Sequence, residues 1–182
     1  MIVIRLKIKL FALSFVTSSL IALLSGSFIK AVDSVSSWTV STSLPYSIAS
    51  HDSTQISNKL YVVGGATNIP TQTVSSTSIN SNGTLSSWNS SLTLIPKSLF
   101  QTSLVSKDNY IYVLGGSEVI DGNTSSSNTV YLGEVQGDGS IPSWTVQTGL
   151  PQNLAQGAAV RSGNRIYYLG GGVWTNGVGP TL

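Results

Sequence analysis

Residues 38–65, WTVSTSLPYSIASHDSTQISNKLYVVGG, decide the fold, because the same pattern returns twice further along the chain. Residues 88–116 read WNSSLTLIPKSLFQTSLVSKDNYIYVLGG, and residues 144–171 read WTVQTGLPQNLAQGAAVRSGNRIYYLGG. Each stretch begins with a Trp, places a Pro seven or eight residues later, and ends in a Gly pair. Self-similarity of this kind, at a spacing of 50 to 56 residues, is the sequence signature of a repeat protein.

Each repeat is composed of strand signals. The segments before the Gly pairs are runs of β-branched and aromatic residues, such as Ile111-Tyr112-Val113-Leu114, and an Asn stands just upstream of each run. Because Asn tolerates the left-handed backbone of a hairpin turn, we expect turns at Asn58, Asn109 and Asn164. The expected third strands are residues 74–79 and 130–135. A short fourth strand is expected after each Asn82-Gly83 or Asp138-Gly139 turn, ending at the following Trp.

Four antiparallel strands in roughly 50 residues describe one blade of a β-propeller. Beyond the N-terminal leader, no segment shows the 3.6-residue apolar period of an amphipathic helix. The predicted fold class is therefore all-β. It consists of four-stranded antiparallel propeller blades preceded by one N-terminal hydrophobic helix.

The repeat resembles the kelch repeat, which is found in β-propellers similar to galactose oxidase. The resemblance is carried by a His, an Asn turn, an apolar-Tyr-apolar strand, a Gly pair and a closing Trp, and it is clearest in the first repeat, from His51 to Gly65. The later repeats depart from the pattern at the His position, where Thr102 and Gly157 stand. The resemblance covers residues 33–173 and implies a propeller fold. It implies little about function, because one fold serves many functions.

The repeats divide the body of the chain, residues 32–182, into a first blade at 39–88, a second at 89–144 and a partial third at 145–182. About two and a half blades are too few to close a ring, because propellers typically have four to eight. An open stack also leaves strand edges unpaired. We expect the sequence to be a truncated propeller. Self-assembly of several copies is the alternative if the chain is complete.

Residues 1–31 are expected to form an export signal. Basic residues at positions 5–9 precede an apolar stretch over 10–24, which is the layout of a secretory signal peptide. The apolar character resumes through Ile29, and twenty such residues are long enough for a transmembrane anchor. A cleaved signal peptide and an uncleaved membrane helix give the same topology, because the positive flank stays in the cytoplasm. The predicted localisation is extracellular or periplasmic, or membrane-anchored with the propeller outside.

Charge and composition exclude several classes of partner. The net charge is +2, but four of the nine Lys and Arg residues lie within the first 30 positions, and the rest of the chain has five basic and seven acidic residues. A nucleic-acid binder needs a clustered basic surface, which this body lacks. The absence of Cys excludes disulfides, thiolate metal sites and a Cys nucleophile. We expect no nucleic-acid partner, no cofactor, and membrane contact only through the N-terminal segment.

No catalytic, metal or cofactor-binding residue is predicted. His51 is the only His, and catalysis by it would need an orienting partner and a nucleophile. We interpret it as a structural residue that hydrogen-bonds backbone near the start of an inner strand. The Gly pairs lack the spacing and the following helix of a phosphate-binding loop. We interpret them as tight strand exits where neighbouring blades approach closely.

The candidate ligand residues lie in the longer connections. In a four-stranded meander, the connections between strands two and three emerge on the same face as those that lead from strand four to the next blade. Long loops on a rigid scaffold are where binding usually resides, and residues 66–73 and 117–129 are such loops. Trp174 follows the third Gly pair and lies outside the repeat register. The predicted ligand-face residues are Tyr46, Glu118, Asp121, Asn123 and Trp174.

These observations favour recognition over catalysis. We expect an exported kelch-type propeller that acts as a binding or protein-interaction scaffold at the cell envelope, with a protein or carbohydrate ligand. One alternative is a propeller enzyme acting on sugars, of the mutarotase or epimerase type, with its catalytic groups in further blades. The copper-radical oxidases among kelch-like propellers use a Cys–Tyr cofactor, which a chain without Cys cannot form. A second alternative is a structural surface or adhesion component, which suits the high Ser and Thr content.

Overall fold

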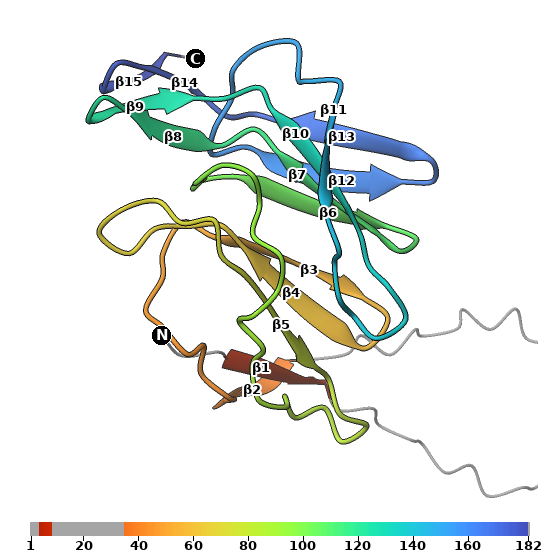
Figure 1. Ribbon diagram of the computed structural model, residues 1–182. Helices are drawn as coiled ribbons and strands as arrows, with labels where there is room; N and C mark the ends of the chain where they lie inside the picture. Colours follow the sequence, from red (N-terminus) through yellow and green to blue (C-terminus); the bar gives the residue numbers. More distant parts are fainter. Residues whose placement is uncertain (1–3, 9–34, 182) are drawn as a thin grey trace, which may run out of the picture.

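The computed structural model describes residues 4–8 and 35–181. Within these ranges, every regular secondary-structure element is a β-strand (Figure 1). The predicted all-β class is confirmed. Three sheets follow one another along the chain and stack in the order of the three sequence repeats. The predicted N-terminal helix falls on residues 9–34, which lie outside the described part. Among the described residues, no helix has the length and apolar character needed to cross a bilayer.

The first blade is an antiparallel sheet of three strands, in the order β3 (Asp52–Ile56), β4 (Lys59–Val63) and β5 (Val74–Ser78). The expected third strand is present as β5. The expected fourth strand is not regular: single bridges join Ile79 to Leu85 and Ser76 to Asn89. Side chains in the intervening turn explain this, because Asn80 and Asn82 both hydrogen-bond Thr84. Such local bonds compete with a strand ladder.

The second blade is the complete one, with strands in the order β6-β7-β10-β11. Their bounds are β6 (Ser103–Lys107), β7 (Tyr110–Leu114), β10 (Val130–Glu134) and β11 (Trp144–Gln147). The prediction that the fourth strand ends at Trp144 was wrong, since β11 begins there. Pro142 lies just before it and has no N–H to donate to a ladder, so pairing with β10 starts only after it.

The third blade contributes β12 (Ala158–Ser162) and β13 (Arg165–Leu169), paired as one hairpin. A second hairpin follows, formed by β14 (Val173–Thr175) and β15 (Val178–Thr181). The second blade has a matching hairpin of β8 (Ser117–Ile120) and β9 (Asn123–Ser126), in the connection that the sequence suggested to be a loop. Their turns, Asp121-Gly122 and Asn176-Gly177, have positive φ at both residues, which is the backbone of a type I′ hairpin turn.

A further pair of strands lies outside the three blades. Strand β1 (Ile4–Ile8) pairs antiparallel with β2 (Val35–Val40). The basic flank of the expected signal therefore lies in a strand, with Arg5 opposite Thr39 and Lys7 opposite Ser37. Strand β2 contains Trp38, which stands at the same repeat position as Trp144 in β11.

The core lies between the blades. The largest buried cluster joins Tyr61 and Val63 of the first blade to Ile111 and Val113 of the second. Burial raises the pKa of Tyr61 to about 12, so its hydroxyl stays protonated and donates to the carbonyl oxygen of Gly139 across the junction (3.0 Å). A second cluster packs Val105, Leu114 and Val130 of the second blade against the third blade. Each blade is thus stabilised by its neighbours in the stack.

The Gly pairs mark the closest approach of neighbouring blades, as the sequence indicated. The amide of Gly65 donates to the carbonyl oxygen of Leu99 in the next blade, and Gly116 donates to Leu154 in the same way, each at 2.8 Å. A Cβ on the preceding Gly115 would lie 2.4 Å from the Leu154 oxygen. Only a residue without a Cβ fits at that distance.

The β-hairpin turns between first and second strands are confirmed, but their left-handed residue precedes the Asn. It is Ser57, Asp108 or Gly163, with φ near +55° in each. Holding a non-Gly residue there costs roughly 1 kcal/mol. We therefore expect Ser57→Gly to raise the free energy of unfolding by about 0.5–1 kcal/mol.

The third turn supplies the matched control for this stabilisation. Gly163→Ala is expected to lower the free energy of unfolding by about 1 kcal/mol, since an added Cβ meets no atom within 4 Å and only the backbone is strained. Urea unfolding of both variants beside the unmodified chain measures the two effects. The same sign of change in both variants would contradict this account of the turn.

Candidate functional site

The first strands of the three blades, β3, β6 and β12, pack against one another where the sheets converge (Figure 1). Each is an edge strand of its own sheet. The blades of a propeller surround a central channel. The row of edge strands therefore marks the channel side of this stack.

One residue with a strained, left-handed backbone precedes each of these strands. Ser50, Gln101 and Gln156 stand at the same repeat position, and all three have positive φ, between 54° and 62°. The amide of Gln101 donates to the carbonyl oxygen of Ser50 (2.7 Å), and the amide of Gln156 donates to that of Gln101 (3.0 Å). Left-handed non-Gly residues are costly and cluster at functional sites. Three in register point to this position as a candidate site.

A cavity of about 590 Å³, which we call the axial cavity, lies beside these three residues. It is lined by residues at the start of β3, β6 and β12, among them Asp52, Ser53, Thr102, Leu104 and Ala158. Both oxygens of the Asp52 carboxylate are hydrogen-bonded, because they accept from the amides of Ser53 and Leu104, both at 2.7 Å. The second of these bonds crosses from the first blade to the second. Asp52 therefore holds together two backbone segments of the cavity wall, and its carboxylate is not an unpaired charge.

Two polar side-chain atoms at this cavity are buried without a hydrogen-bond partner. They are His51 Nδ1 and Thr102 Oγ1, which belong to the same repeat position in successive blades. The prediction that His51 hydrogen-bonds neighbouring backbone is not met at this nitrogen. Buried polar atoms are almost always satisfied, and each exception costs about 1–3 kcal/mol. Both residues line the cavity, although the two atoms themselves have almost no exposed surface.

The His51 imidazole is expected to be neutral at pH 7. Burial lowers its pKa below the ordinary value of 6.5, and the Asp52 carboxylate opposes this shift without overcoming it. Since the chain has a single His, its ring resonances in an NMR titration report on this group alone. We expect a midpoint below 6.5.

The same shift makes stability depend on pH. The unfolded chain binds more protons than the folded one between the two pKa values, so the free energy of unfolding falls as the pH drops from about 6.5 through the folded pKa. His51→Gln should remove this part of the dependence. A ring that titrates at or above 6.5, or an unchanged pH profile in the variant, would show that burial does not govern this group.

The predicted ligand-face residues are divided between two places at one end of the blades, opposite the β3–β4, β6–β7 and β12–β13 turns (Figure 1). Asp121 and Asn123 are exposed at the tip of the β8–β9 hairpin. Trp174 lies on the adjoining β14, where its amide donates to Ser126 Oγ (2.8 Å) and its indole N–H is buried without a partner. Glu118 on β8 pairs with Lys97 at 2.9 Å, a surface ion pair worth little to stability.

Tyr46 lies apart from these hairpin residues. Its hydroxyl shares a hydrogen bond with Ser75 Oγ (2.5 Å), and its ring packs on the first blade beside Ile48 and Val62. It borders an open groove of about 550 Å³ together with Thr67 and other first-blade residues. The structure thus brings Asn123 and Trp174 onto neighbouring hairpins but keeps Tyr46 on a separate surface.

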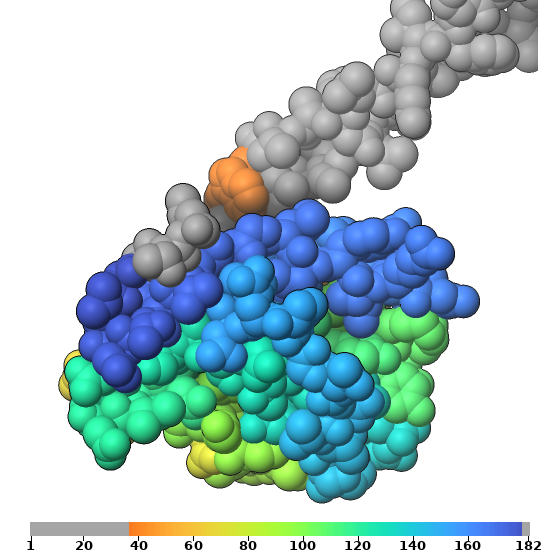
Figure 2. Space-filling view, turned by 90° about the horizontal axis from the view of Figure 1, so that it is seen from above, coloured from red at the N-terminus to blue at the C-terminus, as the bar shows by residue number. Residues whose placement is uncertain are grey.

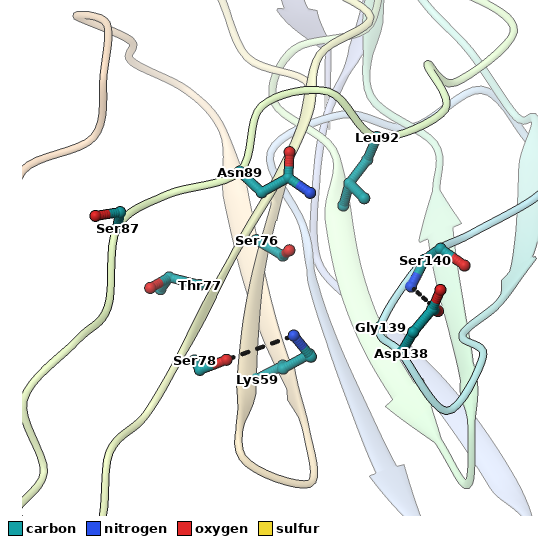
Figure 3. A pocket seen from close by; sticks show the side chains of 10 residues that line it. All are labelled: Lys59, Ser76, Thr77, Ser78, Ser87, Asn89, Leu92, Asp138, Gly139 and Ser140. Carbon is teal, nitrogen blue, oxygen red and sulfur yellow. Dashed lines mark hydrogen bonds between the residues drawn. The ribbon is translucent and has the colours of Figure 1, made fainter.

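A smaller cavity of about 180 Å³ lies at the opposite end, between the first and second blades (Figure 3). Lys59 reaches into it from β4 and donates to Ser78 Oγ (3.4 Å), and its stem covers Gly139. On the other wall, Ser140 donates its amide to Asp138, which holds the pKa of that carboxyl below its usual range. Its walls are mostly strand and turn residues that join two blades, so we assign it to the blade junction.

Among the described residues, no three His, Asp or Glu side chains gather into a group that could hold a metal ion. The Asp121-Gly122-Asn123 segment is the turn of a hairpin, with the side-chain Nδ2 of Asn123 donating to the Asp121 carbonyl oxygen (3.3 Å).

The axial cavity was not identified from the sequence. The sequence does contain a pattern that could have indicated it, because Ser50, Gln101 and Gln156 are spaced by 51 and 55 residues, the same intervals as the Gly pairs. Nothing in these side chains suggests a left-handed backbone, because Gln has no special preference for it. Their role follows from the blade contacts alone.

Comparison with known proteins supports the fold and gives no family. No protein-family model matches the chain, and none of the curated proteins matches it. Among solved structures 107 chains match, and one of them, described as "Structure of YjhT", superposes with a TM-score of 0.62 at 18% sequence identity. The match covers 74% of this chain and 37% of that one, so this chain spans little more than a third of its length. The sheets described above are blades of a β-propeller.

Proposed function

We propose that this protein is an exported β-propeller of the kelch type that binds a protein or carbohydrate ligand at the cell envelope, through the axial cavity. The observation that carries the proposal is the pair of unpartnered polar atoms, His51 Nδ1 and Thr102 Oγ1, at a cavity of about 590 Å³. After rotation of the two side chains toward the cavity, a ligand hydroxyl or amide could bond to these atoms and relieve the cost of their burial.

The cavity chemistry favours binding over catalysis. A general base needs a group within hydrogen-bond reach that orients it or receives its proton. Asp52 is occupied by two backbone amides, and no hydrogen bond joins it to His51 in the described structure. The neutral imidazole and the Thr102 hydroxyl can each donate or accept one hydrogen bond. They suit recognition of an uncharged polar group.

The test compares two positions that could carry the ligand. Ala158 is an exposed residue of the axial cavity, and Thr67 is an exposed residue of the groove beside Tyr46. The chain and its Ala158→Trp and Thr67→Trp variants are applied to an array of envelope polysaccharides and peptides. We expect Ala158→Trp to weaken binding about tenfold or more by filling the cavity, and Thr67→Trp to bind like the unmodified chain. Loss of binding in Thr67→Trp alone would move the site to the groove.

Export is tested separately, with residues 1–40 fused to a reporter enzyme that is active only outside the cytoplasm. The basic flank followed by an apolar stretch should direct the reporter across the membrane. Replacing Leu20 and Leu23 by Lys within the apolar stretch should abolish this activity. Activity that persists in the variant would contradict an export role for the leader.

A further inference from the structure

The cavity between the first and second blades, which we call the junction cavity, lies where the fourth strand of the first blade is irregular (Figure 3). A bridge joins Ser76 of β5 to Asn89 through two backbone hydrogen bonds, of 2.8 and 2.9 Å. Ser76 also lies opposite Tyr61 in the register of β4 and β5. Residues directly opposite one another project on the same face of a sheet. Since Tyr61 packs in the cluster shared with the second blade, Ser76 and Asn89 face that blade as well.

A buried hydroxyl stands on this face where the second blade has an apolar residue. Ser76 is only 4% exposed, and Leu132 stands at its repeat position in the second blade. The neighbouring Thr77 hydroxyl donates to the carbonyl oxygen of Ser86 (2.8 Å). Among the described residues, the Ser76 hydroxyl has no hydrogen-bond partner. Because buried hydroxyls are almost always hydrogen-bonded, we expect the Ser76 hydroxyl to bond to a molecule in the cavity that it lines.

The junction cavity holds one group of each charge, on opposite sides (Figure 3). The ammonium of Lys59 donates to Ser78 Oγ at 3.4 Å, a long hydrogen bond that uses one of its three donors. The Asp138 carboxyl accepts from the Ser140 amide, which lowers its pKa and keeps it ionised at neutral pH. Lys59 repels a cationic ligand, and Asp138 repels an anionic one. The two charges together favour a neutral ligand.

The junction cavity is small and open to solvent at one wall. Its volume of about 180 Å³ is well above the roughly 15 Å³ that one water needs, and below the roughly 300–1,000 Å³ of pockets for drug-sized ligands. Asp138 is exposed, and the connection from β10 to β11 that carries it lies on the surface in the space-filling view, in light blue (Figure 2). A single small molecule therefore fits and has a path to the site.

The polar groups around the junction cavity complement the hydroxyl groups of a sugar. A sugar hydroxyl both donates and accepts hydrogen bonds, as the Ser76 hydroxyl does, whereas the Asp138 carboxylate only accepts and the Lys59 ammonium only donates. Asn89 adds a further donor. Its Oδ1 already accepts from the Ser91 amide (2.9 Å), and its Nδ2 points toward the cavity in Figure 3.

We propose that the junction cavity binds one neutral monosaccharide unit, through hydrogen bonds between its hydroxyl groups and Ser76, Lys59 and Asp138. Both walls of the site belong to the described first and second blades, and the site is separate from the axial cavity. The proposal is therefore independent of the binding function proposed above. Because one sugar unit makes few contacts, binding is weak and exchanges rapidly, which suits detection by NMR of the ligand.

The test is saturation-transfer NMR with the full chain in a detergent that has no sugar head group. Glucose, galactose and mannose are the probes, applied one at a time, and at least one should receive saturation from the protein. Ser76→Leu introduces the residue that the second blade has at this position, fills the cavity and should abolish the transfer. Ala158→Trp, which fills the axial cavity, should leave the transfer unchanged. Loss in Ala158→Trp with no loss in Ser76→Leu would place the sugar in the axial cavity and overturn the proposal.

Two further variants test the role of the charges and do not depend on how Ser76→Leu packs. Lys59→Met keeps the aliphatic stem that covers Gly139, and Asp138→Asn keeps an oxygen for the Ser140 amide. Each should weaken sugar binding about tenfold, because hydrogen bonds to charged groups are the stronger ones. An anion such as acetate would instead bind more tightly to Asp138→Asn.

Acetate and the zwitterion glycine are therefore applied to the same set of variants as competing probes. Transfer to a sugar that Ser76→Leu, Lys59→Met and Asp138→Asn each reduce would support the proposal. No transfer to any of the three sugars would mean that the cavity holds only water. That result, transfer that persists in Ser76→Leu, or binding of acetate or glycine in preference to the sugars would each overturn the proposal.

Discussion

Replacing Ile111 by Ala is expected to lower the free energy of unfolding by about 3–4 kcal/mol. Ile111 has no exposed surface and lies in the cluster that joins the first two blades. Removing three carbon atoms there forfeits their transfer free energy and leaves a cavity between two sheets that cannot easily close around it.

The third blade provides the matched control, since Ile166 stands at the same repeat position. Ile166 is only partly buried and packs against the second cluster. Ile166→Ala should therefore cost about half as much, because part of its side chain already meets water. Urea unfolding followed by tryptophan fluorescence measures both variants. Equal losses at the two positions would mean that the blade junctions do not differ in burial as described.

Gly115→Ala is the second substitution with a large expected effect, a loss of about 2–4 kcal/mol in the free energy of unfolding. Two costs add. Ala at a φ of 58° costs roughly 1 kcal/mol, and a Cβ placed 2.4 Å from the Leu154 carbonyl oxygen forces two blades apart, at about 1–3 kcal/mol. The hydrogen bond from the adjacent Gly116 amide to the same oxygen would also be strained.

Gly170→Ala isolates the backbone part of this cost. Its φ of 67° is similar, but no atom lies within 4 Å of the added Cβ. The loss should be about 1 kcal/mol. Thermal unfolding of the two variants, measured side by side, gives the difference. A Gly170→Ala loss as large as that of Gly115→Ala would show that close blade approach is not what requires Gly.

The blades were predictable because their determinants are local and repeated. The runs before the Gly pairs, such as Ile111-Tyr112-Val113-Leu114, combine β-branched and aromatic residues with turn residues on either side, and each forms a strand where expected. The Gly pairs recur because the same close contact recurs at each junction. A sequence pattern that occurs three times can be recognised even where one repeat departs from it.

The fourth strands and the candidate site were less accessible for a physical reason. Pairing of β11 begins after Pro142, and its start depends on which residues β10 offers as partners rather than on its own composition. The left-handed backbone shared by Ser50, Gln101 and Gln156 is not indicated by these residue types, and the unpartnered atoms of His51 and Thr102 arise from burial by residues distant in sequence. Tertiary context decides all of these features.

The hairpin formed by β8 and β9 shows where the blade accommodates connections of different length. The connection that contains it has 13 residues, whereas the corresponding connection in the first blade has eight. The flanking strands nevertheless keep the same register, with Leu114 opposite Val130 as Val63 is opposite Val74. Changes in length are absorbed by a projection at one end of the blade. A change in the length of this connection is therefore expected to leave the junctions between blades unchanged.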